Sequence, residues 1–588
     1  MGRDGSVSMK KENNEFLGLL CNLYLVALLV ALPLYTGEGY WNLGNTKYAL
    51  FRNVSLLCLG IWLAAGLSIR IWAVAKRVGR RAGKKGSGRL KLGMVDWAVA
   101  AYGICVLLSA LCSDYGSLAW TGYEGWYMGA VSQLLFVGIY FFVSRRYDGA
   151  RWPLYLGEAA LFLVTLFGLL HRLGIDPLRL LIYWNYQNWE YSHMLSTLGN
   201  INWLCGYYSV ALAFGVVHFL REERLWLKLL LYVGNVAAFV LLGVQGSQGG
   251  LLVLAVCVAV CAWLGRRDRA ALTKLWALLA GFFLCMPLMG LGMKLRGNKA
   301  AVVADGNVFA RVEWYVWIMA GAVCIGACLW LVKKGPILGE WIHRRLVKIV
   351  FFSGVAVCLA AALFVLSRHG IGDSFGNGRG FLWRIALEGF GEADARTKLL
   401  GAGPDCYGVA VFGRLGAGTD VWKGEHWEGA VYTNAHNEFL SQLCNVGILG
   451  TVSYLAIFLA GLWRYGQGCG WGRSQGVGDS QSIAQEQGGR RRPVQSVGDS
   501  RIGRQSGRWN YVQSRSPGDA TRLFGLETYD LWMGILAIAM YGAHSLISFQ
   551  QVLNAPLLFL VLGICEHRMR CRWELQGQSE GADSEEMP

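Results

Sequence analysis

A polar stretch between two apolar runs, residues 367–437, carries arginines whose chemistry suits phosphate. Arg379 and Arg384 stand five positions apart in this stretch. A guanidinium group keeps its charge at physiological pH and binds phosphate oxygens in a bidentate way. The pair is therefore a candidate for holding a diphosphate that must be stabilised while it leaves. Alternatively, an arginine at a membrane boundary serves as an anchor whose guanidinium group reaches the lipid headgroups. The spacing of five residues is compatible with phosphate binding and with anchoring.

A histidine and three asparagines stand at the starts of apolar runs. His436 and Asn437 directly precede the run that begins near residue 438, and Asn200 and Asn202 begin an earlier one. An imidazole can remove a proton from a sugar hydroxyl near neutral pH, and Asn437 can orient it. Asparagines can also hydrogen-bond a sugar or a phosphate oxygen. Helix capping is the alternative role for all three asparagines, and a structural role is the alternative for the histidine.

The composition places these residues in a membrane protein. Hydrophobic residues make up 54% of the 588 positions and charged residues only 16%, which is too apolar for a soluble chain of this size. The expected fold class is an all-α polytopic membrane protein, and a secreted domain or a fibrous protein is excluded. Apolar runs of roughly 18 to 22 residues, the length that crosses a bilayer, predict about fourteen transmembrane helices near 16–36, 52–75, 94–112, 127–144, 153–171, 202–220, 225–244, 248–265, 272–293, 313–332, 347–366, 438–463, 528–549 and 555–566.

The formal net charge of +17 is a topology signal rather than the footprint of a nucleic-acid partner. The basic residues gather in short connectors at alternate crossings, as the positive-inside rule describes. This pattern predicts a multi-pass protein of the cytoplasmic (inner or plasma) membrane with both termini cytoplasmic, membrane lipids as partners and no nucleic acid. The stretch 367–437 then becomes one large extracytoplasmic loop. Segment 464–526, rich in Gly, Ser, Gln and Arg, cannot build a core and is predicted to be a disordered basic cytoplasmic linker.

Charged residues in the middle of a span mark ion or proton pathways, because burying a charge in hydrocarbon is costly. Such residues are nearly absent from the predicted spans, since Asp96, Glu158, Glu313 and Asp530 all stand near a helix end. The sequence therefore favours chemistry at the external face over proton-coupled transport.

Taken in order, several motifs resemble the O-antigen ligase and O-antigen polymerase family of polytopic bacterial glycosyltransferases. The resemblance covers about residues 195–460 and rests on Gly-Asn-x-Asn at 199–202, Gly-Arg-x-x-x-Trp at 378–383, Leu-Gly-x-Gly-Pro at 400–404, and His-Asn-Glu-Phe-Leu at 436–440 running into Asn-Val-Gly-Ile-Leu-Gly at 445–450. The tail, 543–556, also looks like the closing helices of the family. The chain then divides into N-terminal transmembrane helices (1–194), the ligase-like core (195–460), the linker and the C-terminal helices with a cytoplasmic tail (527–588).

The resemblance implies transfer of a glycan from an undecaprenyl-diphosphate carrier to an acceptor hydroxyl on the outer face of the membrane, in cell-surface polysaccharide biosynthesis. It implies that His436 is the base and that Arg379 stabilises the departing diphosphate. No metal is required, because arginines can neutralise the charge, and no cofactor is expected. The partners would be a lipid-linked glycan donor and a glycan or glycolipid acceptor. The residues expected to bind substrate are Arg384, Arg311, Asn200, Asn202, Asn437 and Gln248.

One position departs from the family. Members commonly have Ser-Arg-Gly after the seventh spanning helix, whereas this chain has Ser247-Gln248-Gly249. If the family arginine helps to hold the diphosphate, its role is lost here or has passed to Arg311, Arg379 or Arg384.

Three alternatives remain. A repeat-unit polymerase of the same family would differ from a ligase only in its acceptor, which the sequence does not specify. A lipid-linked oligosaccharide flippase or another transporter is less favoured, because a flippase would show two related halves and polar groups deep in the bundle. A polytopic scaffold without activity is the third.

Overall fold

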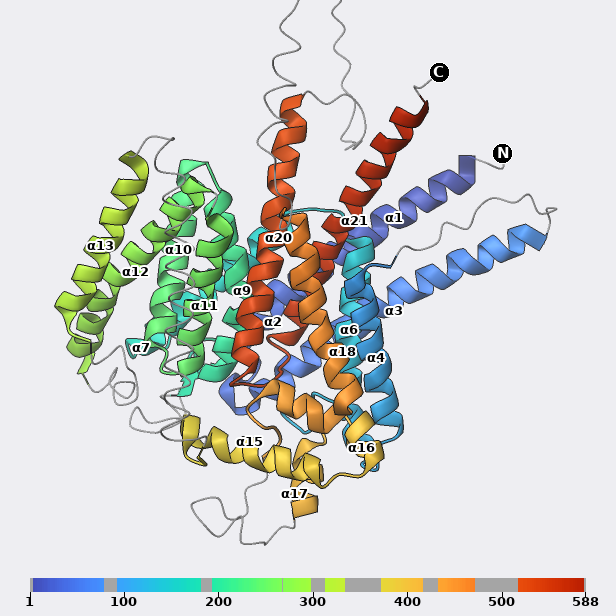
Figure 1. Cartoon of the computed structure of the whole chain (residues 1–588), viewed down its shortest axis with the longest axis horizontal. Helices are drawn as coiled ribbons and strands as arrows, with labels where there is room; N and C mark the ends of the chain where they lie inside the picture. Colours follow the sequence, from blue (N-terminus) through green and yellow to red (C-terminus); the bar gives the residue numbers. More distant parts are fainter. Residues whose placement is uncertain are drawn as a thin grey trace, which may run out of the picture.

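The computed structural model describes residues 4–78, 92–180, 193–266, 268–297, 312–333, 372–415, 432–470 and 517–585. In this part the chain is almost entirely helical (Figure 1). Its one sheet there is a pair of two-residue antiparallel strands, β1 (Met194–Leu195) and β2 (Gly199–Asn200). The described chain is thus an all-α multi-pass membrane protein by the length and composition of its helices.

In the described part of the chain, ten helical segments are long and apolar enough to cross a membrane. The first, Asn13–Leu34, joins most of α1 (Asp4–Val26) to a π-helical turn, η1 (Ala27–Ala31), and to α2 (Leu32–Leu34). The second, Gly39–Ser68, joins η2 (Gly39–Asn42) to most of α3 (Leu43–Val78). The others are α4 (Met94–Leu111), α7 (Trp152–Arg172), α9 (Ile201–Arg221), α10 (Leu225–Val244), α11 (Gln248–Gly265), α12 (Arg269–Arg296), α13 (Trp314–Lys333) and α18 (Glu438–Gly468).

Three further helices occupy positions where the sequence predicts spans. They are α6 (Ala130–Arg146), α20 (Pro517–Ser545) and α21 (Ala555–Glu585). Helix α6 packs against α21, and α20 packs against α9, which is buried along nearly all its length. The predicted span at 347–366 lies outside the described residues, so the total of fourteen stays a prediction. Residues 471–516 of the predicted linker also lie outside them, whereas its two ends continue α18 and begin α20.

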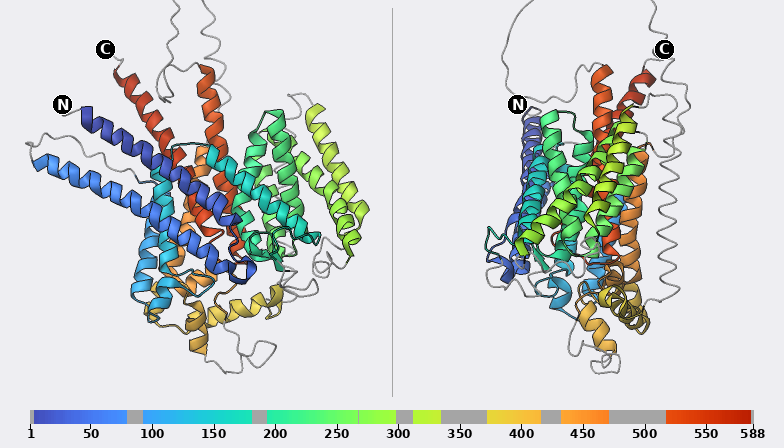
Figure 2. Two further views of the ribbon diagram at one scale, coloured as in Figure 1. Left: turned by 180° about the vertical axis from the view of Figure 1, so that it is seen from behind. Right: turned by 90° about the vertical axis from the view of Figure 1, so that its left-hand side faces the viewer.

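The predicted extracytoplasmic loop is itself helical where it is described. Helices α15 (Phe375–Gly391), α16 (Ala395–Leu400) and α17 (Tyr407–Leu415) follow one another in it, with the five-residue α5 (Ser117–Thr121) in an earlier loop. Figure 1 shows α15 lying across the end of the bundle, and both chain termini point toward the opposite end. The second view in Figure 2 keeps this arrangement. The loop therefore forms a cap over one end of the helices.

Two glycine motifs join this cap to the bundle. The N–H of Ala402, in the Leu-Gly-x-Gly-Pro motif, donates to the carbonyl oxygen of Cys444 at 2.9 Å. Helix α18 is interrupted at Gly447, whose φ is +67°. A Cβ there would also overlap the backbone of Leu399. Glycine is needed at position 447 because the cap and the helix approach each other backbone to backbone.

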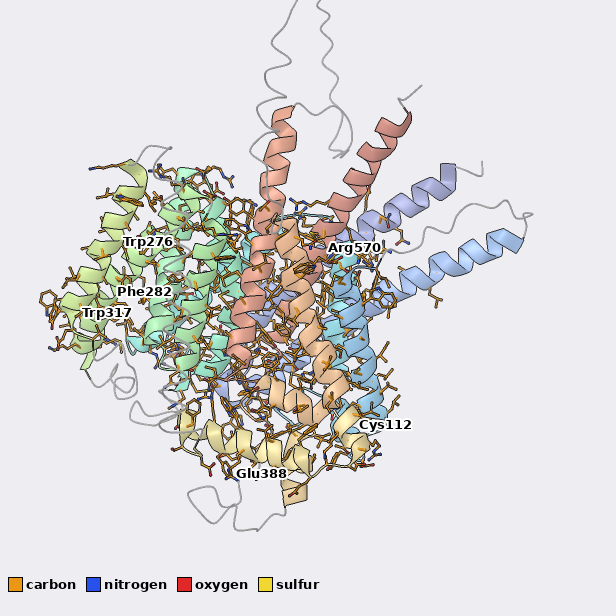
Figure 3. All side chains as sticks on the ribbon, viewed as in Figure 1. Cys112, Trp276, Phe282, Trp317, Glu388 and Arg570 are labelled. Atoms are coloured by element: carbon orange, nitrogen blue, oxygen red, sulfur yellow. The ribbon has the colours of Figure 1, made fainter. Side chains whose placement is uncertain are left out.

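Buried charged residues gather in one cluster at the ends of the predicted spans. Arg464 of α18 makes a bidentate ion pair with Glu566 of α21, with N–O distances of 2.7 and 2.8 Å, and both side chains are buried. Nearby, Asp96 of α4 accepts from Tyr140 at 2.8 Å and pairs with Arg570, which Figure 3 labels. Each of these acids faces an arginine, so the cluster ties four helices together without an uncompensated charge.

Candidate active site

A cavity of about 180 Å³ opens where the cap meets the bundle. Its lining comes from three segments far apart in the chain: the start of α9, the start of α15 and the turn before α18. The residues that line it are Asn202, Asn377, Gly378, Arg379, Phe381, Leu382, Tyr432 and His436. Arg379, His436 and Asn202, which the sequence singles out separately, therefore share one cavity.

Arg379 is fixed by backbone carbonyl groups rather than by acids. Its Nη1 donates to the oxygen of Gly376 at 2.7 Å, and its Nε donates to the oxygen of Ile547 at 3.0 Å. Among the described residues no carboxylate lies within ion-pair distance of it. Burial lowers the pKa of the Arg379 guanidinium, but an arginine keeps its proton in proteins. The cavity wall thus carries a positive charge that no acid in the described part of the chain neutralises.

The local backbone presents Arg379 to the cavity through a left-handed turn. Gly376, Asn377 and Gly378 have φ values of 60°, 61° and 84°. Two glycines make this turn accessible, and asparagine tolerates the same region better than most residues. The Gly-x-Gly-Arg order at 376–379 is therefore explained by the turn that precedes the regular part of α15.

His436 lies opposite, also in a left-handed conformation, with φ +46°. Its backbone N–H donates to the Asn434 side chain at 3.1 Å, which stabilises the turn. Its ring meets the ring of Phe549 edge to face, with the centroids 5.0 Å apart. Burial, and second the nearby charge of Arg379, lower the pKa of His436 to about 4. The imidazole is consequently neutral at physiological pH, the form that can accept a proton.

The asparagines act mainly as caps. Asn200 accepts from the N–H of Asn202 at 2.8 Å at the start of α9, and Asn437 accepts from the N–H of Leu440 at 3.1 Å at the start of α18. Asn202 differs, since it lines the cavity while its Oδ1 accepts from the hydroxyl of Ser247 at 2.9 Å.

Gln248 is exposed at the first position of α11 and is not among the residues that line the cavity. The residues on either side of Gln248, however, lie close to the cavity. Ser247 bonds to Asn202, and a side chain at Gly249 would contact the buried ring of His544.

Arg384, which the sequence analysis expected to bind substrate, does not line the cavity with Arg379. It pairs with Asp373 at 2.7 Å and with Glu388 at 3.2 Å on the exposed side of α15, where Figure 3 labels Glu388. These pairs raise the pKa of the Arg384 guanidinium. Five residues correspond to about 140° around a helix, so the two arginines point in different directions. Arg311 lies outside the described residues.

The turn between α20 and α21, residues 546–554, is the element that the sequence reasoning missed. The Ile547 carbonyl holds Arg379, and the Phe549 ring contacts His436. Gln550 donates to the Tyr454 hydroxyl at 3.0 Å. The sequence contained a signal for this turn, because serine, glutamine and asparagine stand between two apolar runs. In the structure these polar side chains are buried.

A smaller cavity, of about 30 Å³, lies beside the first. Phe549 lines it and contacts His436, which lines the first cavity, so the two cavities are neighbours. Its floor is a network in which Glu438 accepts from Tyr541 at 3.0 Å, from Ser545 at 2.8 Å and from Tyr454. The residues that line it are Trp126, Met128, Gln133, Pro404, Asp405, Asn434, Glu438, Ser441, Gln442, Asn445, Phe549 and Gln550.

Within the described ranges no group of three or more His, Cys, Asp and Glu side chains is placed to hold a metal ion. Comparison with models of known protein families finds no family that matches this chain, and no curated protein matches it either. The case for a function therefore depends on the geometry of the site.

Proposed function

We propose that this protein is a metal-independent membrane glycosyltransferase of the O-antigen ligase type, which transfers a glycan from an undecaprenyl-diphosphate carrier to an acceptor hydroxyl. The reaction would take place at the outer face of the cytoplasmic membrane, in cell-surface polysaccharide biosynthesis. One observation carries the proposal: an arginine without an acidic partner among the described residues and a neutral histidine line the same cavity, at the end of a membrane-spanning bundle.

The charge of Arg379 suits the donor. Two carbonyl oxygens hold its guanidinium in place before any ligand arrives, so little reorganisation is needed when charge develops. As the bond between the sugar carbon and the phosphate oxygen breaks, that oxygen becomes negative, and Arg379 stabilises it. Undecaprenyl diphosphate is the leaving group.

The imidazole of His436 suits the acceptor. The acceptor oxygen forms the new bond to the sugar carbon, and its proton passes to the neutral imidazole. A pKa of about 4 makes a weak base in the empty site, and the charge of Arg379 is one of its causes. A bound diphosphate would offset that charge and raise the pKa of His436, so the base would strengthen when the donor is present.

The smaller cavity adds polar groups close to His436 that suit an acceptor hydroxyl. It is lined by the ring of Trp126 and by the amides of Gln133, Gln442 and Gln550, which also bond to one another. Amide and carboxylate groups beside an aromatic ring are suited to sugars. A ligase and a repeat-unit polymerase would both use such a site, so polymerisation remains the alternative within this class.

Donor binding tests the proposal directly. The probe is undecaprenyl diphosphate, added to the purified full-length protein, and the variants are Arg379→Gln and the matched control Arg384→Gln from the same helix. Loss of a charge-assisted contact, roughly 1.5–3 kcal/mol, should weaken binding about 10- to 100-fold in the first variant. The control should bind like the wild type, because Arg384 is engaged with Asp373 and Glu388. Equal affinity in all three proteins would refute the role of Arg379.

A further inference from the structure

A third cavity lies at the other end of helix α9, far from the candidate active site. It opens between α7, α9 and α20, and its polar lining includes Arg151, Glu158, His218, Arg221 and Asp530. Arg221 follows Asn202 by nineteen residues along α9, which corresponds to roughly 28 Å along the helix axis. Because this is close to the thickness of a bilayer core, the two cavities lie at opposite faces of the membrane.

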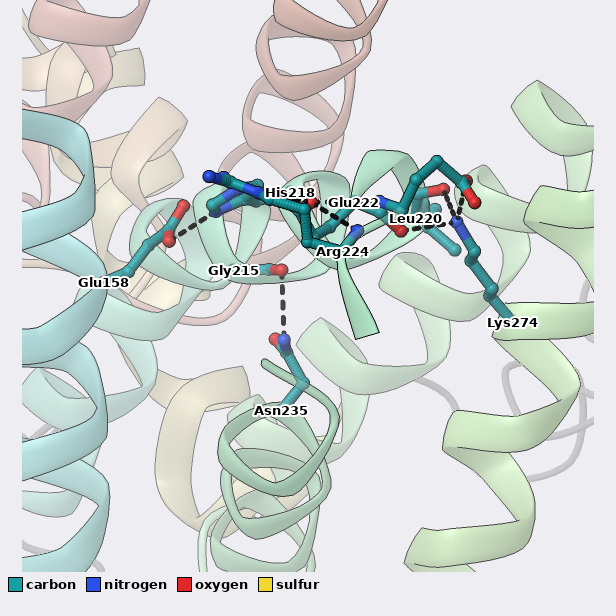
Figure 4. A network of polar contacts seen from close by, with 9 residues as sticks. Glu158, Gly215, His218, Leu220, Glu222, Arg224, Asn235 and Lys274 are labelled. Carbon is teal, nitrogen blue, oxygen red and sulfur yellow. Dashed lines mark hydrogen bonds and ion pairs between the residues drawn. The ribbon is translucent and has the colours of Figure 1, made fainter. Parts of the chain in front are cut away.

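The acids around this cavity are already engaged. Glu158 bonds to the Nδ1 atom of His218 at 2.6 Å, as Figure 4 shows. Asp530 accepts from Arg568 at 2.9 Å and from Arg151 at 3.4 Å. Glu222, on the other side of His218, is held by Arg224 at 3.1 Å (Figure 4).

One cation is left over. Within the described part of the chain, the guanidinium of Arg221 makes no hydrogen bond or ion pair, although it is half-buried and lines the cavity beside Arg151. Asp530 and Glu222 act on this charge without a direct bond to it. Because a guanidinium gains from a direct contact with a charged acceptor, Arg221 and Arg151 can share an anion in this cavity.

The surface beside the cavity faces lipid. Helix α7 exposes one stripe at helical spacing, formed by Trp152, Tyr155, Leu156, Ala159, Leu163 and Leu166. Its aromatic residues stand at the end next to Arg151, the level at which tryptophan and tyrosine meet lipid headgroups. Tyr155 also stacks on His218, with ring centroids 4.9 Å apart, so this stripe runs directly into the cavity wall.

We propose that this cavity binds the phosphate of an anionic membrane phospholipid, between Arg221 and Arg151, with the acyl chains along the exposed stripe of α7. A basic pocket between helix ends is suited to such headgroups. The volume of this cavity is about 30 Å³, which exceeds the roughly 10–15 Å³ that one water molecule needs. The cavity is therefore suited to a small group such as a phosphate and not to a large headgroup. The site is independent of the glycosyltransferase proposal.

The test uses the purified full-length protein in detergent and native mass spectrometry with phosphatidylglycerol, phosphatidylcholine or sodium phosphate. Phosphatidylglycerol should bind the wild type more tightly than phosphatidylcholine does. Arg221→Gln should weaken that binding about tenfold or more, because a charge-assisted contact to the phosphate is lost. The control is Arg384→Gln, which removes an exposed arginine at the other end of the bundle, and it should leave binding unchanged.

The outcomes separate the possible sources of the anion. If phosphatidylglycerol binds and Arg221→Gln weakens this binding, the lipid site is supported. If only sodium phosphate binds in a way that Arg221→Gln weakens, the cavity is an anion site filled from solution. Equal binding in the wild type and Arg221→Gln with both probes overturns the proposal. If Arg221→Gln fails to fold, Arg151→Gln replaces it, because Asp530 keeps its pair with Arg568 in that variant.

Discussion

The Nε atom of Arg379 donates to the carbonyl oxygen of Ile547 at 3.0 Å, across 168 positions of the chain. The donor belongs to the cap, and the acceptor belongs to the turn between α20 and α21. Two residues later in the same turn, Phe549 contacts His436. A single short turn thus positions both residues that we propose for catalysis, and it makes the C-terminal helices part of the site.

The edge-to-face contact with Phe549 should position the base. In Phe549→Leu the ring contact, roughly 0.5–1.5 kcal/mol, is lost, and kcat for glycan transfer should fall several-fold while KM for the donor changes little. Phe549→Tyr keeps the ring and should restore kcat. Steady-state kinetics in proteoliposomes measures both. A rise in KM with unchanged kcat would instead place Phe549 in donor binding.

The pH dependence of transfer should reveal the coupling between Arg379 and His436. In the free protein the pKa of His436 is about 4, so kcat/KM should stay flat from neutral pH down to about pH 5 and then fall as the imidazole gains a proton. The acid limb of kcat should lie at higher pH, because the bound diphosphate raises the pKa of the base. Coincident limbs for the two parameters would argue against this coupling.

Asp405 should make the stability of the cap depend on pH. Its carboxylate accepts from the N–H groups of Tyr123 at 2.8 Å and Met128 at 3.1 Å, and burial raises its pKa to about 7. The unfolded value is lower, about 3.9. The folded state therefore holds the proton more tightly, and the free energy of unfolding falls as the pH rises from about 4 to 7, by roughly 4 kcal/mol at most.

The variant Asp405→Asn keeps an acceptor for both N–H groups but cannot ionise. Its melting temperature in detergent should lack this decline, so its advantage over the wild type should grow between pH 4 and pH 8. An equal pH dependence of the two melting temperatures would show that Asp405 does not ionise in this range.

Replacing Gln248 by arginine tests the departure from the family pattern. The flanking Ser247 and Gly249 lie against Asn202 and His544, next to the cavity. A second guanidinium there should tighten the binding of undecaprenyl diphosphate several-fold, in a way that high salt reduces. Gln248→Lys controls for charge without the bidentate geometry. Unchanged affinity in the arginine variant would mean that position 248 does not reach the phosphates.

Removal of residues 471–516 should leave transfer intact. Their composition cannot build a core. Gly468 at the end of α18 lies against Leu531 of α20, which follows Pro517 by roughly 21 Å of helix, so a flexible Gly-Ser connection of about ten residues can bridge the gap. Transfer activity of the shortened protein in proteoliposomes measures this. An inactive but folded deletion variant would assign these residues a role in the reaction.

The sequence by itself determined the positions of the long apolar helices that the structure describes. Apolar runs set where the helices lie, because hydrophobic periodicity and length are local properties. The sequence also singled out Arg379 and His436, because the charge of an arginine and the basicity of a histidine are properties of the residue type. It gave capping as the alternative role of Asn200 and Asn437, which it expected to bind substrate, and both caps are present.

Only the tertiary structure decided which of these residues meet. Arg379 and Arg384 carry the same charge, and the packing of α15 alone turns the first to the cavity and leaves the second to Asp373 and Glu388. The contacts of Ile547 and Phe549 with the cap join residues more than a hundred positions apart, so no local pattern encodes them. The buried pair of Arg464 and Glu566 escaped prediction for the same reason, because each charge is tolerated in the membrane only through its partner on another helix.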